Sequence, residues 1–302
     1  MSRAGLSKAV GDDALRAALD RFLDITDPAP LVLRDPVALV RGYADPHDQE
    51  VAGLLVAALA YGRASFIQVT ARKALAHLGS RPARAVDSGD TSGLSGFVYR
   101  FQKGDDLPRF LAAIAGLRKK HGSLAAAFAS VVDPDDPDYA PALDRWSLAL
   151  RAEVTGALSP GLKFLLPRAG ATGAAKRLCL YLRWMIRPSG PVDLGAWHQL
   201  APDRLDPARL VIPLDTHIER IGRYIGLTDR ASGGLETARD ITARLSRLRP
   251  ADPLAYDLAL CHLGISGACP RKRDVVACRE CPIRTICRLG KTPRGWNAAV
   301  AV

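Results

Sequence analysis

Apolar runs long enough to span a bilayer are absent from this 302-residue sequence, and Met1 is not followed by a charged and then apolar leader. Stretches of strand-forming residues are scarce, and there is no internal repeat or long low-complexity segment. These absences argue against a membrane-spanning protein, a repeat protein and a β-rich fold. We therefore expect a soluble, cytoplasmic protein with no membrane partner.

Ala, Leu and Arg are abundant, and apolar residues recur every three or four positions, which is the spacing of one helix face. This pattern predicts an all-α fold. Pro28, Pro30 and Pro36 should interrupt helix formation and leave a connector after the first helix. The helices expected are residues 12–23, 48–60, 65–77, 107–119, 123–131, 139–157, 176–187, 194–200, a segment from just after Pro213 to 225, 238–248 and 256–264.

A net charge of +11 points to a polyanionic partner, with nucleic acid first and a membrane surface second. The charge is concentrated near the C-terminus, where eight basic residues stand against two acidic ones between Cys269 and Arg294. Three of them, Arg271, Lys272 and Arg273, are consecutive and would grip phosphates if a metal held their loop in place. A solvated basic surface is the simpler reading of isolated charges.

Four cysteines fall within 19 residues in the spacing C-x8-C-x2-C-x5-C, too short a stretch to form a core of its own. Clustered cysteines in an intracellular protein favour metal ligation over disulfides. Structural zinc sites usually pair two C-x2-4-C knuckles, and only one is present, so the spacing favours a 4Fe–4S cluster, with zinc second and buried thiols third. The expected ligands are Cys269, Cys278, Cys281 and Cys287, whereas Cys179 and Cys261 lie in apolar helical stretches and are expected to be core thiols.

A tight turn at Tyr61-Gly62-Arg63 is expected between two helices. One interpretation is that Tyr61 and Arg63 bind DNA, with the aromatic ring as a wedge that enters the duplex when a base leaves the stack. The other is that Tyr61 covers the core and Arg63 is solvated.

A loop with Gly170 and Gly173 leads into the helix that starts at Lys176. Backbone N–H groups at such a helix start can bind phosphate oxygens. Lys176, Arg183 and Arg187 should share a basic face of this helix. The helix dipole together with neighbouring arginines would disfavour the ammonium form of Lys176 and make its amine a better nucleophile. The alternative is a solvated or phosphate-contacting lysine.

Asp215 follows an extended apolar approach that ends at Pro213. Thr216 and Glu219 have the T-x-x-E form of a capping box, which would leave the Asp215 carboxylate free at the mouth of a cleft. The alternative is that Asp215 itself caps the helix. His217 is expected to be a structural hydrogen-bonding residue.

The order of these features resembles the helix-hairpin-helix DNA glycosylases similar to endonuclease III. The similarity is carried by the glycine hairpin before a helix, the segment Leu214-Asp215-Thr216-His217 and the four-cysteine C-terminal loop. It covers approximately the second half of the chain and is closest to a bacterial family within that superfamily. The lysine position of the usual hairpin holds Thr172, as in monofunctional relatives.

The resemblance implies a two-lobed fold, with residues 45–165 as a helical barrel lobe and residues 1–44 plus 166–302 as the lobe of the hairpin, the catalytic Asp and the iron–sulfur loop. It implies a monomeric base-excision repair enzyme that binds double-stranded DNA and hydrolyses the N-glycosidic bond of a damaged or modified base. Asp215 would be catalytic, and Lys176 would be the nucleophile if the enzyme is also an AP lyase. A glycosylase acting on RNA and a non-catalytic nucleic-acid-binding protein remain alternatives.

Overall fold

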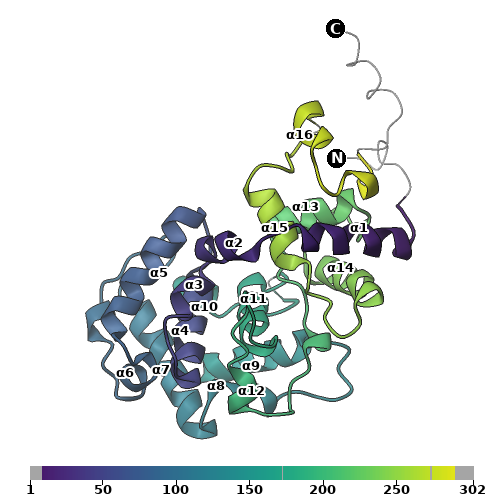
Figure 1. Cartoon of the computed structure of the whole chain (residues 1–302). Helices are drawn as coiled ribbons and strands as arrows, with labels where there is room; N and C mark the ends of the chain where they lie inside the picture. The colour runs from purple at the N-terminus through teal and green to yellow at the C-terminus, as the bar shows by residue number, and fades with distance from the viewer. Residues whose placement is uncertain (1–8, 172, 273, 290–302) are drawn as a thin grey trace, which may run out of the picture. The chain divides into compact units, whose positions relative to one another are not determined.

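The regular secondary structure of the residues that the computed structural model describes, which are 9–171, 173–272 and 274–289, consists of helices, with no strands (Figure 1). Within these residues, no helix has both the length and the apolar character needed to cross a membrane. The elements follow the order α1 (Asp12–Asp24), α2 (Pro28–Arg34), α3 (Val37–Val40), α4 (Pro46–Leu59), α5 (Ala64–Leu78), α6 (Pro82–Asp87), η1 (Ser92–Leu94), α7 (Asp106–His121), α8 (Leu124–Ala129), α9 (Ala140–Ala152), α10 (Pro160–Leu165), α11 (Lys176–Ile186), α12 (Trp197–Leu200), η2 (Pro207–Arg209), α13 (Thr216–Tyr224), α14 (Leu235–Leu248), α15 (Asp257–Ile265), α16 (Val275–Arg279) and η3 (Arg284–Ile286).

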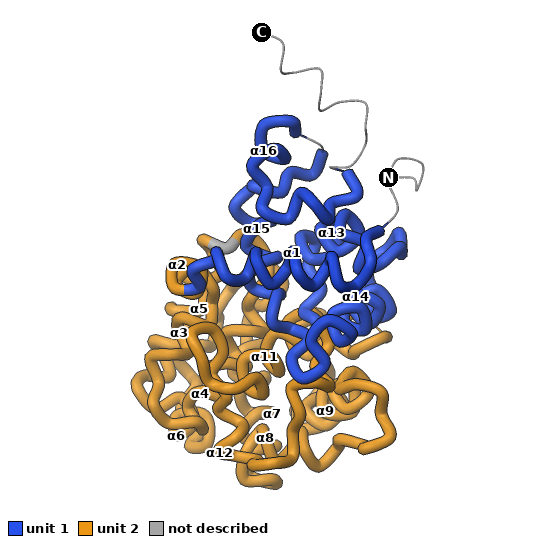
Figure 2. The backbone as a smooth tube through the Cα atoms, turned by 45° about the vertical axis from the view of Figure 1, so that its right-hand side comes forward, with its two compact units in different colours: residues 1–28, 212–302 blue, residues 29–211 orange. Residues whose placement is uncertain are grey.

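The chain divides into two compact units, residues 29–211 and residues 1–28 with 212–302 (Figure 2). These boundaries differ from the lobes expected from the resemblance, which placed residues 29–44 and 166–211 with the C-terminal loop. The physical reason is packing: α11 lies along α4, and α3 and α12 also pack on α4, so these segments share its core.

In the unit of residues 29–211, α4 is buried on nearly every side. Gly53 lies where α11 meets it. A Cβ at Gly53 would be 2.7 Å from Met185 Cε and 3.3 Å from Tyr181 Cε2, so a larger residue would require the Met185 side chain to move and the Tyr181 ring to shift slightly. The Tyr181 ring in turn packs edge-on against Trp197, with ring centroids 5.3 Å apart. Large buried aromatic side chains therefore fill the space around the α4 and α11 contact.

A fully buried carboxylate ties four elements of this unit together. Glu50 in α4 accepts hydrogen bonds from the backbone N–H groups of Leu124 (3.0 Å) and Ala125 (3.1 Å) at the start of α8. It also accepts from Trp197 Nε1 at 3.2 Å and forms an ion pair with Arg118 of α7. A buried charge is tolerated only when its oxygens are fully used in this way.

The other unit joins the two ends of the chain, because α1 packs on α14. Asp12 pairs with Arg244 at 2.7 Å, and Asp20 pairs with Arg249 at 2.8 Å. Tyr256 also donates its hydroxyl to Asp20. In the same unit α13 packs on both α14 and α15.

One sequence expectation about the first connector is wrong. Residues 28–34 form the helix α2 although they include Pro28 and Pro30. Both prolines lie in its first turn, where backbone N–H groups have no partner inside the helix, so the missing donors cost nothing.

We expect the unit of residues 1–28 and 212–302 to lose stability in acid because of Asp20. Burial alone would raise the pKa of Asp20, but hydrogen bonds from Tyr256 and Arg249 outweigh it and leave the pKa below its usual 3.8. A lowered folded-state pKa stabilises the fold above the unfolded pKa, and this contribution disappears as pH falls through the folded value. Thermal unfolding of Asp20→Asn should therefore depend less on pH below about 4 than that of the parent. Asp24→Asn, an exposed position on the same helix, is the control; equal acid dependence in all three proteins would contradict the assignment.

Candidate metal centre and carboxylate site

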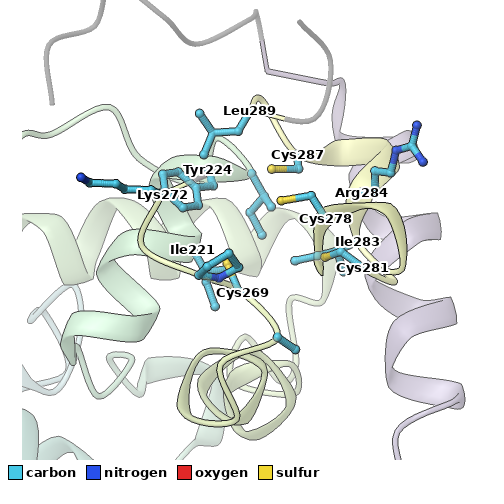
Figure 3. Close-up of a pocket in the computed structure, with 13 residues that line it drawn as sticks. Ile221, Tyr224, Cys269, Lys272, Cys278, Cys281, Ile283, Arg284, Cys287 and Leu289 are labelled. Atoms are coloured by element: carbon cyan, nitrogen blue, oxygen red, sulfur yellow. The ribbon is translucent and has the colours of Figure 1, made fainter. Parts of the chain in front are cut away.

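The four clustered cysteines line one hollow in the C-terminal unit (Figure 3). Cys269 follows α15, Cys278 lies in α16, Cys281 follows α16, and Cys287 follows η3. All four are half-buried. The rest of the wall is mainly apolar, including Ile221 of α13. Four thiols on a shared, partly closed space are a donor set for a thiophilic metal group.

The hollow is held in shape by backbone hydrogen bonds that do not depend on the thiols. The Cys269 N–H donates to the Leu263 carbonyl at 3.0 Å, and the Arg288 N–H donates to the Tyr224 carbonyl at 2.6 Å. Tyr224 in turn donates its hydroxyl to the Arg271 carbonyl at 2.8 Å. Both ends of the loop are thus attached to α13 and α15.

Burial makes the thiols of Cys269 and Cys281 costly to ionise without a cation. Burial raises the pKa of Cys281 to about 11, a backbone hydrogen bond from Ile283 opposes this, and the other loop thiols raise it further. Burial also raises the pKa of Cys269, against the opposing charge and hydrogen bond of Arg220. Thiols that raise one another's pKa are close neighbours, and a bound metal would compensate their negative charge as thiolates.

Among the residues that the structure describes, no three His, Cys, Asp or Glu side chains form a group that could hold one metal ion. Zinc draws its sulfur ligands to about 2.3 Å from one point. An iron–sulfur cubane instead binds four thiolates at the corners of a larger body. The cluster stays a prediction from the C-x8-C-x2-C-x5-C spacing.

Asp215 is the N-cap of α13, so the expected Thr216 capping box is wrong. Its Oδ1 accepts hydrogen bonds from the N–H groups of His217 and Ile218, both at 2.8 Å. Thr216 is exposed, and the Glu219 carboxylate forms an ion pair with Arg223, one turn later in α13. Asp215 takes the cap position because it stands one residue before Thr216, where the backbone is extended. Its carboxylate also offers two acceptor oxygens, whereas the threonine hydroxyl offers one.

The second oxygen of Asp215 has a partner that the sequence analysis placed in the core. Cys261 of α15 donates its thiol to Asp215 Oδ2 at 3.2 Å. Cys261 is half-buried rather than buried, whereas Cys179 in α11 is buried as expected. Asp215 is itself half-buried, and both of its carboxylate oxygens have partners within the protein.

Lys176 is the first residue of α11 and is half-buried. The preceding loop is a tight turn, in which Gly170 N–H donates to the Gly173 carbonyl at 2.9 Å. Gly170 and Gly173 have φ values of 82° and 105°, which favour glycine. Thr172 lies outside the described residues.

The expected basic face of α11 is not found. Arg183 is 2 % exposed and pairs with Asp193 at 3.2 Å, and Arg187 pairs with the same carboxylate. Arg177 is buried as well and donates to the Ala58 carbonyl at 2.5 Å. The guanidinium groups of Arg177, Arg183 and Arg187 are thus bound to carbonyls and a carboxylate of the same unit rather than lined up with Lys176 on an exposed face.

Tyr61 packs within the unit of residues 29–211. Its hydroxyl donates to the Tyr99 carbonyl at 2.9 Å, and its ring lies edge-on against Phe164, with centroids 4.7 Å apart. Burial raises the pKa of Tyr61 to about 12. Arg63, the N-cap residue of α5, is exposed. A ring engaged in this way is placed to support the surface, while Arg63 is available to a partner.

Of the three consecutive basic residues, Arg271 and Lys272 are exposed on the cysteine loop, and Arg273 lies outside the described residues. Lys272 also lines the hollow. The two units divide the candidate residues. Asp215, the four cysteines, Arg271 and Lys272 belong to one unit, and Lys176, Gly170, Gly173, Tyr61 and Arg63 belong to the other.

Sequence reasoning missed Arg220, Tyr224 and the role of Cys261. Arg220 and Tyr224 are four residues apart on α13, and Arg220 Nη2 donates to the Cys269 carbonyl at 2.7 Å. Their helical spacing was visible in the sequence, and it could have been read as a second, polar contact face of this helix.

A family model described as "Protein of unknown function (DUF2400)" matches residues 35–266. No curated protein and no solved structure matches the chain. The matched stretch includes Lys176, Asp215 and Cys261 and ends before Cys269.

We expect protein purified without oxygen to contain about four iron and four sulfide per chain, because the four thiols suit a cubane. Cys281→Ala should lose most of the iron, since one of the four ligands is missing. Cys179→Ala, which removes a thiol outside the hollow, should keep it. Elemental analysis with the visible absorption spectrum measures both, and stoichiometric zinc in place of iron would contradict the cluster.

Proposed function

We propose that this chain, which belongs to the DUF2400 family, is a DNA base-excision glycosylase with a 4Fe–4S cluster in its C-terminal loop. It hydrolyses the N-glycosidic bond of a damaged or modified base in double-stranded DNA, as a monomer of two-lobed helix-hairpin-helix fold. The turn at Gly170 and Gly173 before α11 is the hairpin of that fold.

The observation that carries the proposal is the placement of Asp215. Its carboxylate is held by two backbone N–H groups and a thiol, is half-buried, and belongs to the same unit as the four-cysteine hollow. A fixed carboxylate near the surface is what a reaction with a developing positive charge requires.

Base release passes through a sugar with oxocarbenium character, which a nearby carboxylate stabilises. Asp215 performs this role, orients the water that attacks C1′ of the sugar and accepts its proton, while the departing base takes the bonding electron pair and a proton from solvent. The target nucleotide leaves the base stack first. The cluster, when bound to Cys269, Cys278, Cys281 and Cys287, supplies cross-links that fix the loop.

Phosphate contacts come from exposed cations. Arg271 and Lys272 on the cysteine loop and Arg63 at the start of α5 are exposed, and the chain carries a net charge of +11. Such contacts position a duplex without reading its sequence. In the turn before α11, the N–H of the exposed Gly173 contacts the same backbone, whereas the Gly170 N–H already donates to the Gly173 carbonyl.

The AP lyase activity is assigned to Lys176. Its Nζ attacks C1′, the base leaves with the bonding electrons, and the ring opens to a Schiff base that permits β-elimination of the 3′ phosphate. The half-buried position at the start of α11 is the feature that favours Lys176 over the exposed lysines.

A second candidate is a non-catalytic iron–sulfur protein that binds nucleic acid. The observation that favours it is the use of Asp215 as a helix cap, because both of its oxygens already have partners inside the protein. In that case Asp215 contributes to stability alone.

Asp215→Asn separates the two candidates. Asparagine also caps helices well, so α13 should be retained. For a glycosylase, we expect single-turnover base release to fall about 10²–10³-fold with little change in DNA affinity, because the charge on the carboxylate is lost. Asp45→Asn, at the N-cap of α4, is the matched control and should keep parental turnover. Unchanged base release in Asp215→Asn would rule out the catalytic role, and binding without base release on a broad lesion panel would favour the second candidate.

Borohydride trapping tests Lys176. With duplexes that carry candidate lesions or an abasic site, we expect a covalent protein–DNA adduct in the parent and none in Lys176→Ala. Lys163→Ala, at an exposed position of α10, should still form it. Base release without an adduct would place the protein among the monofunctional enzymes and remove Lys176 from the mechanism.

A further inference from the structure

The two oxygens of the Asp215 carboxylate have partners of different kinds. Oδ1 accepts hydrogen bonds from two backbone N–H groups in the first turn of α13. Among the hydrogen bonds described, Oδ2 accepts one, from the thiol of Cys261 at 3.2 Å. Rotation about the Cβ–Cγ bond moves both oxygens together, so the two N–H bonds to Oδ1 already restrain it. The thiol adds the one contact made to Oδ2 itself among the described hydrogen bonds, and it further restricts the direction in which Oδ2 points.

The α15 surface around this thiol is shaped to receive the first turn of α13. Cys261 and Gly264 are three residues apart and lie on the same face of α15. A Cβ at Gly264 would lie 2.6 Å from the Cβ and the Nδ1 of His217, so a larger residue there would push the two helices apart. Glycine permits the approach, and this approach brings the cysteine sulfur to the carboxylate.

The chemistry of the donor matters as much as its position. A thiol is a weak hydrogen-bond donor, so it can orient a carboxylate while withdrawing little of its negative charge. An arginine or lysine at this position would neutralise the charge that an oxocarbenium sugar requires. Cys261 is also distinct from the four loop cysteines, since it lies within α15 and does not line the hollow.

We infer that Cys261 is a positioning residue, whose thiol holds Asp215 Oδ2 in the orientation that faces the reacting sugar. The inference rests on the proposed glycosylase function and adds a residue to it. Substrate affinity comes from phosphate contacts elsewhere, so loss of the thiol acts on the chemical step.

The test compares Cys261→Ala, which removes the donor, with Cys261→Ser, which keeps one. Single-turnover base release should fall about tenfold to a hundredfold in the alanine variant, the range expected for a lost hydrogen bond to a charged group. KM and iron content should stay at parental values. The serine variant should recover most of the rate. Cys179→Ala, the other cysteine outside the loop, controls for loss of a thiol as such. Parental kcat in Cys261→Ala, or serine and alanine variants that are equally impaired, would overturn the inference.

A second measurement does not depend on activity. In the intact protein, iodoacetamide labelling of Cys261 can be followed by peptide mass spectrometry. A carboxylate beside a thiol disfavours the reactive thiolate, so Asp215→Asn should speed alkylation of Cys261 several-fold over the parent. Asp45→Asn should leave the rate unchanged. Faster alkylation in Asp215→Asn from a parent that releases no base would retain the contact and reject the glycosylase function. An unchanged alkylation rate would reject the contact itself.

Discussion

The close approach of α13 and α15 is the constraint on which the candidate site depends. Gly264 lets the His217 side chain lie directly on α15, and the same approach brings Cys261 to Asp215. Arg220, one turn further along α13, reaches the carbonyl of Cys269, the first residue of the four-cysteine set. One helix contact therefore fixes both the direction of a carboxylate and one edge of the thiol hollow, so a change at Gly264 would disturb both.

The longer helices could be predicted from the sequence because their apolar residues follow a regular spacing. The short helices α3, α6, α10 and α16 were not predicted, because four to six residues are too few to show that spacing. Residues 28–34 could not be predicted either, because proline is unfavourable inside a helix and harmless in its first turn, and the sequence alone does not show where a helix begins. The predicted cap of α13 was wrong for the same reason, because the sequence did not show at which residue the helix begins. Thr216 and Glu219 match a capping box, but Asp215 stands one residue earlier and takes both N–H groups. Two local capping patterns, a Thr216 capping box and an Asp215 cap, therefore compete in the sequence. The contact from Cys261 comes from another helix, so neither pattern could predict it.

Net charge was a poor guide to where the cations are. Arg118, Arg177 and Arg183 are at most 8 % exposed, and their guanidinium groups bind carboxylates and carbonyls inside the unit of residues 29–211. Helical periodicity placed Arg183 on a basic face of α11, because charged residues are usually exposed. Its partner Asp193 lies ten residues later, beyond the end of α11, so no pattern within the helix could reveal the pair.

The unit that contains Asp215 is assembled from the two extremes of the sequence, since α1 makes ion pairs with Arg244 and Arg249. During synthesis α1 leaves the ribosome long before these partners exist, and its apolar residues Leu15 and Leu19, buried in the finished unit, must wait for them. Residues 29–211 are contiguous in sequence and form a compact unit, so all of that unit has been synthesised before α13 to α15. Capture of the first helix and closure of the cysteine loop are thus late events, and a chain that ends at residue 211 would hold all of the helical unit together with an α1 whose apolar face is unpaired and prone to aggregation.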